Sequence, residues 1–394
     1  MYTIGAGPPT TSGADSHLEE LNVSPNKTPP FRAEHIGSLL RPASLLEQRG
    51  RFSRGEIDGA ALTAAEDEAI RAALAMQQRV GLHFATDGEF RRRSYHSYFY
   101  RQLGDVSIDT VGGHDAQGGN AGARGEQPVA VIGSRLLWSK PINLADHAFI
   151  KANSPLVSKI TIPGPCALHF RGGDQAVLKS AYRDVSQFWD DTVEAFVTEL
   201  DVLAKAGCTY IQIDETAFAK FGDPEVQASL AARGDDWSRL IDTYVDVTNR
   251  ILRRAPKGMA IGMHLCRGNR GGQWHAEGSY EDVAERLFNA LEIPFYFLEY
   301  DSPRAGNFQP LRAVPKPKRV VLGLVSTKAG TLEKLDDLKA RVDEAGRFVD
   351  IERLAVSPQC GFASVETGNP LSEAEQEAKL RLVVDLARAI WGEA

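Results

Sequence analysis

Four side chains that could bind one metal ion lie far apart in the chain: His264, Cys266, Glu299 and Cys360. His264 and Cys266 close an apolar run two residues apart, so a β-strand there would point both side chains to one face. Imidazole, thiolate and carboxylate groups are ligands that Zn²⁺ accepts in tetrahedral sites. We therefore predict Zn²⁺ as the cofactor, with these four residues as its ligands.

The spacing of these residues argues for a catalytic metal rather than a structural one. No C-x-x-C pair is present, and the ligands are spread over about a hundred residues, unlike those of zinc fingers and ribbons. Two thiolates make a metal electron-rich, which favours activation of a sulfur nucleophile over generation of hydroxide. We expect a substrate thiol that attacks an electrophilic carbon.

Further polar groups close other apolar runs and are candidates for substrate binding. Ile36 and Ser38 could hold a carboxylate through backbone and hydroxyl groups. Glu89 and Asp214 could bind an ammonium group or transfer a proton, and we expect both to be catalytic. For each acid taken alone, a helix-capping or solvated role is an equal alternative.

These residues need a scaffold that brings distant strand ends together. Apolar runs alternate with amphipathic segments, which is typical of βα units and a parallel sheet. The eight expected strands are residues 33–37, 82–86, 158–162, 208–214, 259–265, 295–300, 319–325 and 353–358. Eight such strands close a (β/α)8 TIM barrel, an α/β fold whose active site lies at the carboxyl ends of the strands.

The chain is expected to form a single catalytic domain with one insertion. Residues 1–30 are rich in Gly, Pro, Ser and Thr and predict a disordered tail, which leaves 31–394 for the barrel. An insertion at 105–150 separates the second and third strands. It is either a decorated hairpin or a lid or subunit contact in a homo-oligomer, and the sequence leaves these alternatives open.

Local patterns predict where several helices begin and which face they bury. Thr63 with Glu66, and Ser372 with Glu375, have the spacing of capping boxes. Residues 184–206 carry an apolar stripe that should pack on the barrel, with Glu199 among the acids placed off it.

Composition excludes several classes of protein. Of the 394 residues, 43% are hydrophobic and 25% charged, which fits a globular protein. The net charge of −7 disfavours a nucleic-acid partner, and the four cysteines are too few for a disulfide framework. Neither a membrane span nor a signal peptide is evident, so we expect a cytoplasmic enzyme without a membrane partner.

At the proposed ligands the sequence resembles the catalytic barrel of cobalamin-independent methionine synthases. The shared motifs are His264 with Cys266, Glu299, Cys360 with Gly361, HIGS at 35–38, DGE at 87–89, IPGP at 162–165 and QIDE at 212–215. The resemblance implies Zn²⁺ on the four ligands and homocysteine held by Ser38, Glu89 and Asp214. It further implies a zinc-dependent methyltransferase of the 5-methyltetrahydropteroyltriglutamate–homocysteine type, whose partners are a small-molecule thiol and a methyl donor.

The sequence also departs from that family. It has one barrel where full-length synthases have two, and Ser326 and Thr327 stand where the family has a histidine after the seventh strand. Residues 266–274 resemble short single-barrel relatives instead. An alternative is a relative of epoxyalkane:coenzyme M transferase, with Arg91, Arg92, Arg93 and Arg267 binding a sulfonate. A further alternative is a barrel without zinc, as in decarboxylases that act on porphyrins.

Overall fold

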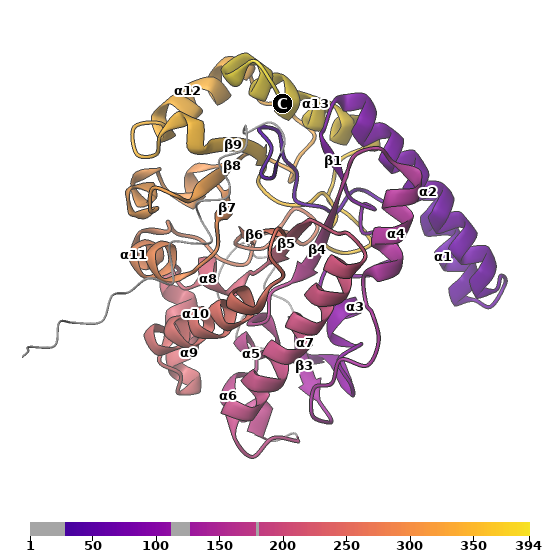
Figure 1. The fold of residues 1–394 in the computed structure, drawn as a ribbon, viewed down its shortest axis with the longest axis vertical. Helices are drawn as coiled ribbons and strands as arrows, with labels where there is room; N and C mark the ends of the chain where they lie inside the picture. Colours follow the sequence, from indigo (N-terminus) through magenta and orange to yellow (C-terminus); the bar gives the residue numbers. More distant parts are fainter. Residues whose placement is uncertain (1–27, 112–126, 179–180) are drawn as a thin grey trace, which may run out of the picture.

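The computed structural model describes residues 28–111, 127–178 and 181–394 (Figure 1). Most of the predicted tail, residues 1–27, lies outside the described residues. No helix in the described ranges is long and apolar enough to cross a membrane.

The described part of the chain contains a curled, seven-stranded parallel sheet in the order β1-β4-β5-β6-β7-β8-β9 (Figure 1). Sequential strands are neighbours, as expected for consecutive βα units. The strands are β1 (Phe84–Ala85), β4 (Val157–Pro163), β5 (Tyr210–Asp214), β6 (Ala260–Leu265), β7 (Phe295–Glu299), β8 (Arg319–Val325) and β9 (Leu354–Pro358). Seven of the expected strands are confirmed, and all seven run parallel.

The first expected strand, residues 33–37, forms only an isolated parallel bridge, between Ala33 and Val356 of β9. On its other side the Thr86 hydroxyl donates to the Gly37 carbonyl at 2.7 Å, which is a side-chain contact and not a strand ladder. The α/β fold with its curled parallel sheet is therefore confirmed. Closure into a complete eight-stranded barrel stays a prediction.

Helices surround the curled sheet (Figure 1). The longer ones are α1 (Ala43–Ser53), α2 (Gly59–Val80), α4 (Leu144–Asn153), α7 (Val185–Lys205), α9 (Pro224–Arg233), α10 (Trp237–Arg254), α11 (Glu281–Ala290), α12 (Leu335–Ala345) and α13 (Glu373–Trp391). Short helices are α3 (Ser97–Tyr100), α5 (Ala167–Phe170), α6 (Gly173–Leu178) and α8 (Ala217–Lys220). The capping box of Ser372 and Glu375 is confirmed on α13. The capping box predicted for Thr63 and Glu66 is wrong, because α2 begins earlier and Asp58 caps it.

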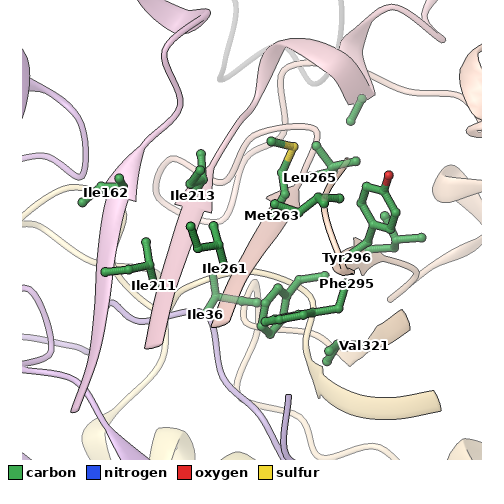
Figure 2. Packing of buried hydrophobic residues seen from close by; sticks show 14 of the residues in the cluster. Ile36, Ile162, Ile211, Ile213, Ile261, Met263, Leu265, Phe295, Tyr296 and Val321 are labelled. Atoms are coloured by element: carbon green, nitrogen blue, oxygen red, sulfur yellow. The ribbon is translucent and has the colours of Figure 1, made fainter. Parts of the chain in front are cut away.

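The strands divide apolar and polar side chains between their two faces. Figure 2 shows Ile211 and Ile213 of β5 with Met263 and Leu265 of β6, all of them buried. Because side chains alternate along a strand, Asp214, which follows Ile213, and His264, between Met263 and Leu265, belong to the opposite face. The two are paired in register, so the sheet itself places a carboxylate beside an imidazole.

The insertion contains an antiparallel hairpin of β2 (Val106–Val111) and β3 (Gln127–Ile132). Its return segment is fixed by Glu199 of α7, whose carboxylate accepts hydrogen bonds from Trp138 Nε1 at 2.8 Å and the Asn143 N–H at 2.7 Å. The placement of Glu199 off the buried stripe was therefore wrong: it is fully buried because it serves these donors. A role of the insertion as lid or subunit contact stays a prediction.

Candidate metal centre and active-site cavity

Three of the four proposed ligands meet in the structure. One ligand atom from each of His264, Cys266 and Cys360 lies within 4.8 Å of the others, and all three residues are buried. His264 lies in β6, Cys266 directly follows it, and Cys360 follows β9. Strand ends distant in sequence thus converge at the carboxyl edge of the sheet, as the barrel interpretation predicts.

Glu299, at the end of β7, lies outside this group of three but close to it. Its Oε2 accepts the Arg267 N–H at 2.7 Å, while Oε1 contacts Arg304 at 2.5 Å and Lys328 Nζ at 3.2 Å. Burial alone would raise the pKa of Glu299, but Lys328, Arg304 and Arg267 hold it well below its usual value. Glu299 is therefore an ionised carboxylate beside the group, and its role as fourth ligand stays a prediction.

The donor set of the group suits a soft divalent metal ion. Neither ring nitrogen of His264 has a hydrogen-bond partner among the described residues, although the side chain is buried. Hydrogen bonding from the Cys360 thiol, with the charge of His264, holds the pKa of Cys266 well below that of a free thiol. An imidazole with available nitrogens and an acidic thiol are what Zn²⁺ binding requires, because ligands must be deprotonated.

A cavity of about 230 Å³ opens onto this group. The expected substrate residues Ile36, Ser38, Glu89 and Asp214 all line it, together with His264, Cys266 and Cys360. The structure thus brings seven of the eight proposed site residues to one cavity, and Glu299 is the one that does not line it. What each residue binds there stays a prediction.

The two acids in the cavity are held by specific neighbours. Glu89 Oε1 accepts a hydrogen bond from the Thr161 hydroxyl at 2.9 Å, whereas Oε2 has no partner among the described residues. Asp214 Oδ1 accepts from Gln212 Nε2 at 2.6 Å. Burial raises the pKa of Asp214 to about 7 and that of Glu89 above its usual value. Asp214 can therefore carry or release a proton near neutral pH.

Glu89 also has an unusual, left-handed backbone conformation. Its φ of 60° makes it the one positive-φ residue other than glycine in the described ranges. Such a conformation costs on the order of 1–3 kcal/mol for a side chain of this size. The hydrogen bond from the Thr161 hydroxyl holds its carboxylate at the wall of the cavity.

The other end of the cavity was largely missed by sequence reasoning. Its lining includes Tyr95, His96, Arg101, Arg171, Thr216, Lys220, Arg270 and His275. These residues come from loops and short helices without a recognisable motif. Only the folded chain brings them together.

The arginines expected to bind a sulfonate lie elsewhere. Arg91 pairs with Asp67 at 2.7 Å, and Arg92 donates to Thr161 Oγ1 at 2.8 Å. Arg267 is fully buried, with its guanidinium over the Tyr280 ring. None of these three, nor Arg93, is among the residues of the described chain that line the cavity. The support that they lent to the coenzyme M alternative is removed.

Lys328 lies in the segment after β8, where the resembled family has a histidine and this chain does not. It follows β8 and contacts Glu299, while its Nζ also lies 3.0 Å from Asp301 Oδ2. Ser326 donates its hydroxyl to Asp301, and Thr327 Oγ1 donates to the Gly361 carbonyl. Ser326, Thr327 and Lys328 thus contact Glu299, Asp301 and Gly361, and none of the three is among the described residues that line the cavity.

Comparison with known proteins agrees with this geometry. The family model of the cobalamin-independent synthase catalytic domain matches residues 31–389. The uncharacterised protein YxjH of Bacillus subtilis is 37% identical over 380 residues, covering 95% of this chain and 99% of YxjH. A 5-methyltetrahydropteroyltriglutamate–homocysteine methyltransferase of Serratia proteamaculans is 22% identical, and the match covers 90% of this chain but 42% of that enzyme.

A solved structure is also similar to this chain. The putative vitamin-B12-independent methionine synthase of Listeria monocytogenes superposes with a TM-score of 0.70 at 32% identity, covering 92% of this chain and 99% of that one. The family model and this structure both extend over nearly the whole described chain. The chain therefore belongs to the cobalamin-independent methionine synthase family.

Proposed function

We propose that this protein is a zinc-dependent S-methyltransferase that methylates a small thiol of the homocysteine type. The observation that carries the proposal is the group of His264, Cys266 and Cys360 at one wall of a cavity that also contains Glu89 and Asp214. Family membership supports a methyltransferase. The zinc dependence rests on the donor atoms of the group.

His264, Cys266 and Cys360 would hold the Zn²⁺, with Glu299 as the fourth ligand. A zinc ion bound there would lower the pKa of a coordinating thiol, so that the sulfur is nucleophilic near neutral pH. The three cations around Glu299 keep its carboxylate ionised and ready to coordinate.

The remaining cavity residues would bind and orient the acceptor. Glu89 Oε2, which has no hydrogen-bond partner among the described residues, is placed to receive an ammonium group. The Ser38 hydroxyl faces Gly361 and the backbone of Ala363, next to Cys360, where it would contact the carboxylate end. Asp214, with its raised pKa, would accept the proton released from the thiol. One sulfur–carbon bond then forms as the methyl–donor bond breaks, and its electron pair leaves with the donor.

The test measures metal, thiol binding and product separately. Purified protein should contain zinc, and homocysteine should change the zinc X-ray absorption edge as a sulfur ligand is added. Methionine should appear when homocysteine is supplied with a folate, cobalamin or small S-methyl donor. Zinc that stays sub-stoichiometric after metal is added would overturn the proposal, as would an unchanged edge with every thiol tested.

A further inference from the structure

Asn269 connects the loop after β6 with the loop after β9. It is the third residue after Cys266, and it lines the cavity although only 4% of its surface is exposed. Its Nδ2 donates to the Gly361 carbonyl at 3.0 Å and to Thr327 Oγ1 at 2.8 Å. Because Gly361 directly follows Cys360, Asn269 lies at the end of the cavity that contains the candidate metal ligands.

The backbone on both sides of Asn269 is fixed by its own loop. Gly268 has a φ of +96°, and a Cβ there would lie 2.1 Å from His275 Cδ2, so a side chain at this position would collide with the imidazole ring. Arg270 and Gln273 then exchange two backbone hydrogen bonds, with N···O distances of 2.9 and 3.1 Å. These contacts hold Asn269 at one place on the cavity wall.

Hydrogen bonding determines which way round the amide of Asn269 lies. A carbonyl oxygen can only accept, so the amide nitrogen must face Gly361. The Thr327 hydroxyl donates to the same carbonyl at 3.0 Å, and its oxygen therefore accepts from Asn269. The other amide atom, Oδ1, is buried and has no hydrogen-bond partner among the described residues. The free group of Asn269 is thus an acceptor and not a donor.

A second buried acceptor lies at the same end of the cavity. Glu89 Oε2 also has no hydrogen-bond partner in the part of the chain that the structure describes. Short contacts link the two acceptors: Gly37 lies against Glu89, and the next residue, Ser38, lies against Gly361, to which Asn269 is bound. Burying such groups is costly unless a hydrogen bond compensates. An amide oxygen and a carboxyl group together suit a cationic ligand group with several N–H donors.

We propose that Asn269 is a specificity-determining residue, whose Oδ1 accepts a hydrogen bond from the ammonium group of the thiol substrate. The inference rests on the proposed function for the identity of that substrate, an amino acid of the homocysteine type. Its thiolate and its carboxylate have no hydrogen to donate, so its ammonium group, with three N–H donors, is the group that can satisfy Oδ1. Glu89 supplies charge to this group, and Asn269 supplies direction. A thiol without the amino group leaves both acceptors unsatisfied and binds more weakly.

The test compares two ligands that differ only in the amino group: methionine and 4-(methylthio)butanoate. Neither carries a free thiol, so calorimetry on the purified full chain measures their binding without dependence on zinc or turnover. The parent should bind methionine more tightly. Asn269→Ala should weaken methionine binding roughly 10- to 100-fold, as expected for loss of a hydrogen bond to a charged group, and leave 4-(methylthio)butanoate binding unchanged.

Asn369→Ala is the matched control. Asn369 is 6% exposed, and its Nδ2 donates to the Thr327 carbonyl at 2.9 Å and to the Gly361 carbonyl at 3.5 Å. Its Oδ1, however, accepts from the Gly272 N–H at 2.9 Å, and Asn369 is not among the described residues that line the cavity. This variant should keep the parent's ratio of the two affinities.

The ratio of the affinities separates recognition from a structural role. Without Asn269, the Gly361 carbonyl still accepts from the Thr327 hydroxyl, so the two loops stay anchored. Asn269→Leu, which is close to asparagine in shape, is the second variant if Asn269→Ala does not fold. An unchanged ratio in a folded Asn269 variant would overturn the proposal, as would a parent that shows no preference for methionine. Zinc content and methionine formation test the proposed function separately, so either conclusion can fail alone.

Discussion

At the scale of single residues, the convergence of His264, Cys266 and Cys360 leads to a direct prediction. Cys266→Ser and Cys360→Ser should each reduce the zinc content of the purified protein from stoichiometric to trace, because each removes a thiolate from a three-residue group. Metal analysis by mass spectrometry checks this. Cys208→Ser is the matched control, since Cys208 is buried near the start of β5 and should leave zinc unchanged. Full zinc in either ligand variant would contradict the assignment.

Asp214 gives a prediction about pH. Burial raises its pKa to about 7, so in the metal-free protein it is protonated below that pH and ionised above it. Carboxyl carbon NMR of aspartate-labelled protein should show a titration near this value that is missing in Asp214→Asn. Added zinc should move the midpoint downward, because a nearby dication favours the ionised form. A midpoint near the ordinary aspartate value without metal would contradict this account.

The convergence of His264, Cys266 and Cys360 was more predictable from the sequence than the surroundings of these residues. His264 and Cys266 are two residues apart in one strand, so their common face follows from the strand period. The ion pairs of Glu299 with Arg304 and Lys328 depend on loops after β7 and β8, whose courses no local pattern specifies. The cavity residues Tyr95, His96, Arg171 and Lys220 were missed for the same reason.

At the scale of elements, the turn that carries Ile36 and Ser38 depends on Gly37. Its φ is +132°, and a Cβ there would lie 2.5 Å from Thr161 Cγ2 and 3.1 Å from Glu89 Oε1. Gly37→Ala should therefore destabilise the fold by about 1–3 kcal/mol and disturb Glu89. Urea unfolding measures the change. Gly59→Ala is the control: with no atom near its Cβ and a helical position, it should be neutral or stabilising by roughly 0.5–1 kcal/mol.

Elements with a strong local period were predictable and those without one were not. Eight strands were expected because short apolar runs are bounded by turns, and seven of them form the parallel sheet. The Ser372 capping box was visible as a spacing. The start of α2 was misplaced because Thr63 with Glu66 has the spacing of a capping box, whereas the helix already begins at Gly59, with Asp58 as its cap. Glu199 was misplaced because its partners come from the insertion, far along the chain.

At the scale of the whole molecule, the sequence could not decide how the sheet closes. Residues 33–37 have the alternation of a strand, but pairing on both edges depends on how far the sheet curls. In the structure this segment is joined to β4 and β5 mainly by buried polar side chains. Lys159 Nζ lies 3.0 Å from Glu34 Oε2 and 2.6 Å from the His35 carbonyl, and the Tyr210 hydroxyl donates to Glu34 at 2.6 Å.

These contacts make the closure testable. Lys159→Met should destabilise the protein by about 3–5 kcal/mol, since it leaves the fully buried Glu34 without its cation. The double variant E34Q/K159M removes both charges and should recover a large part of that loss. Chemical unfolding of the three proteins measures the differences, and hydrogen exchange shows whether protection is lost first in residues 31–39. If Lys159→Met unfolds at the same denaturant concentration as the parent, the buried pair does not hold this segment against the sheet. If the double variant is no more stable than Lys159→Met, the charge of Glu34 does not explain the loss of stability. The lysine then acts through its contact with the His35 carbonyl and its packing on Phe84, Tyr210 and Phe297.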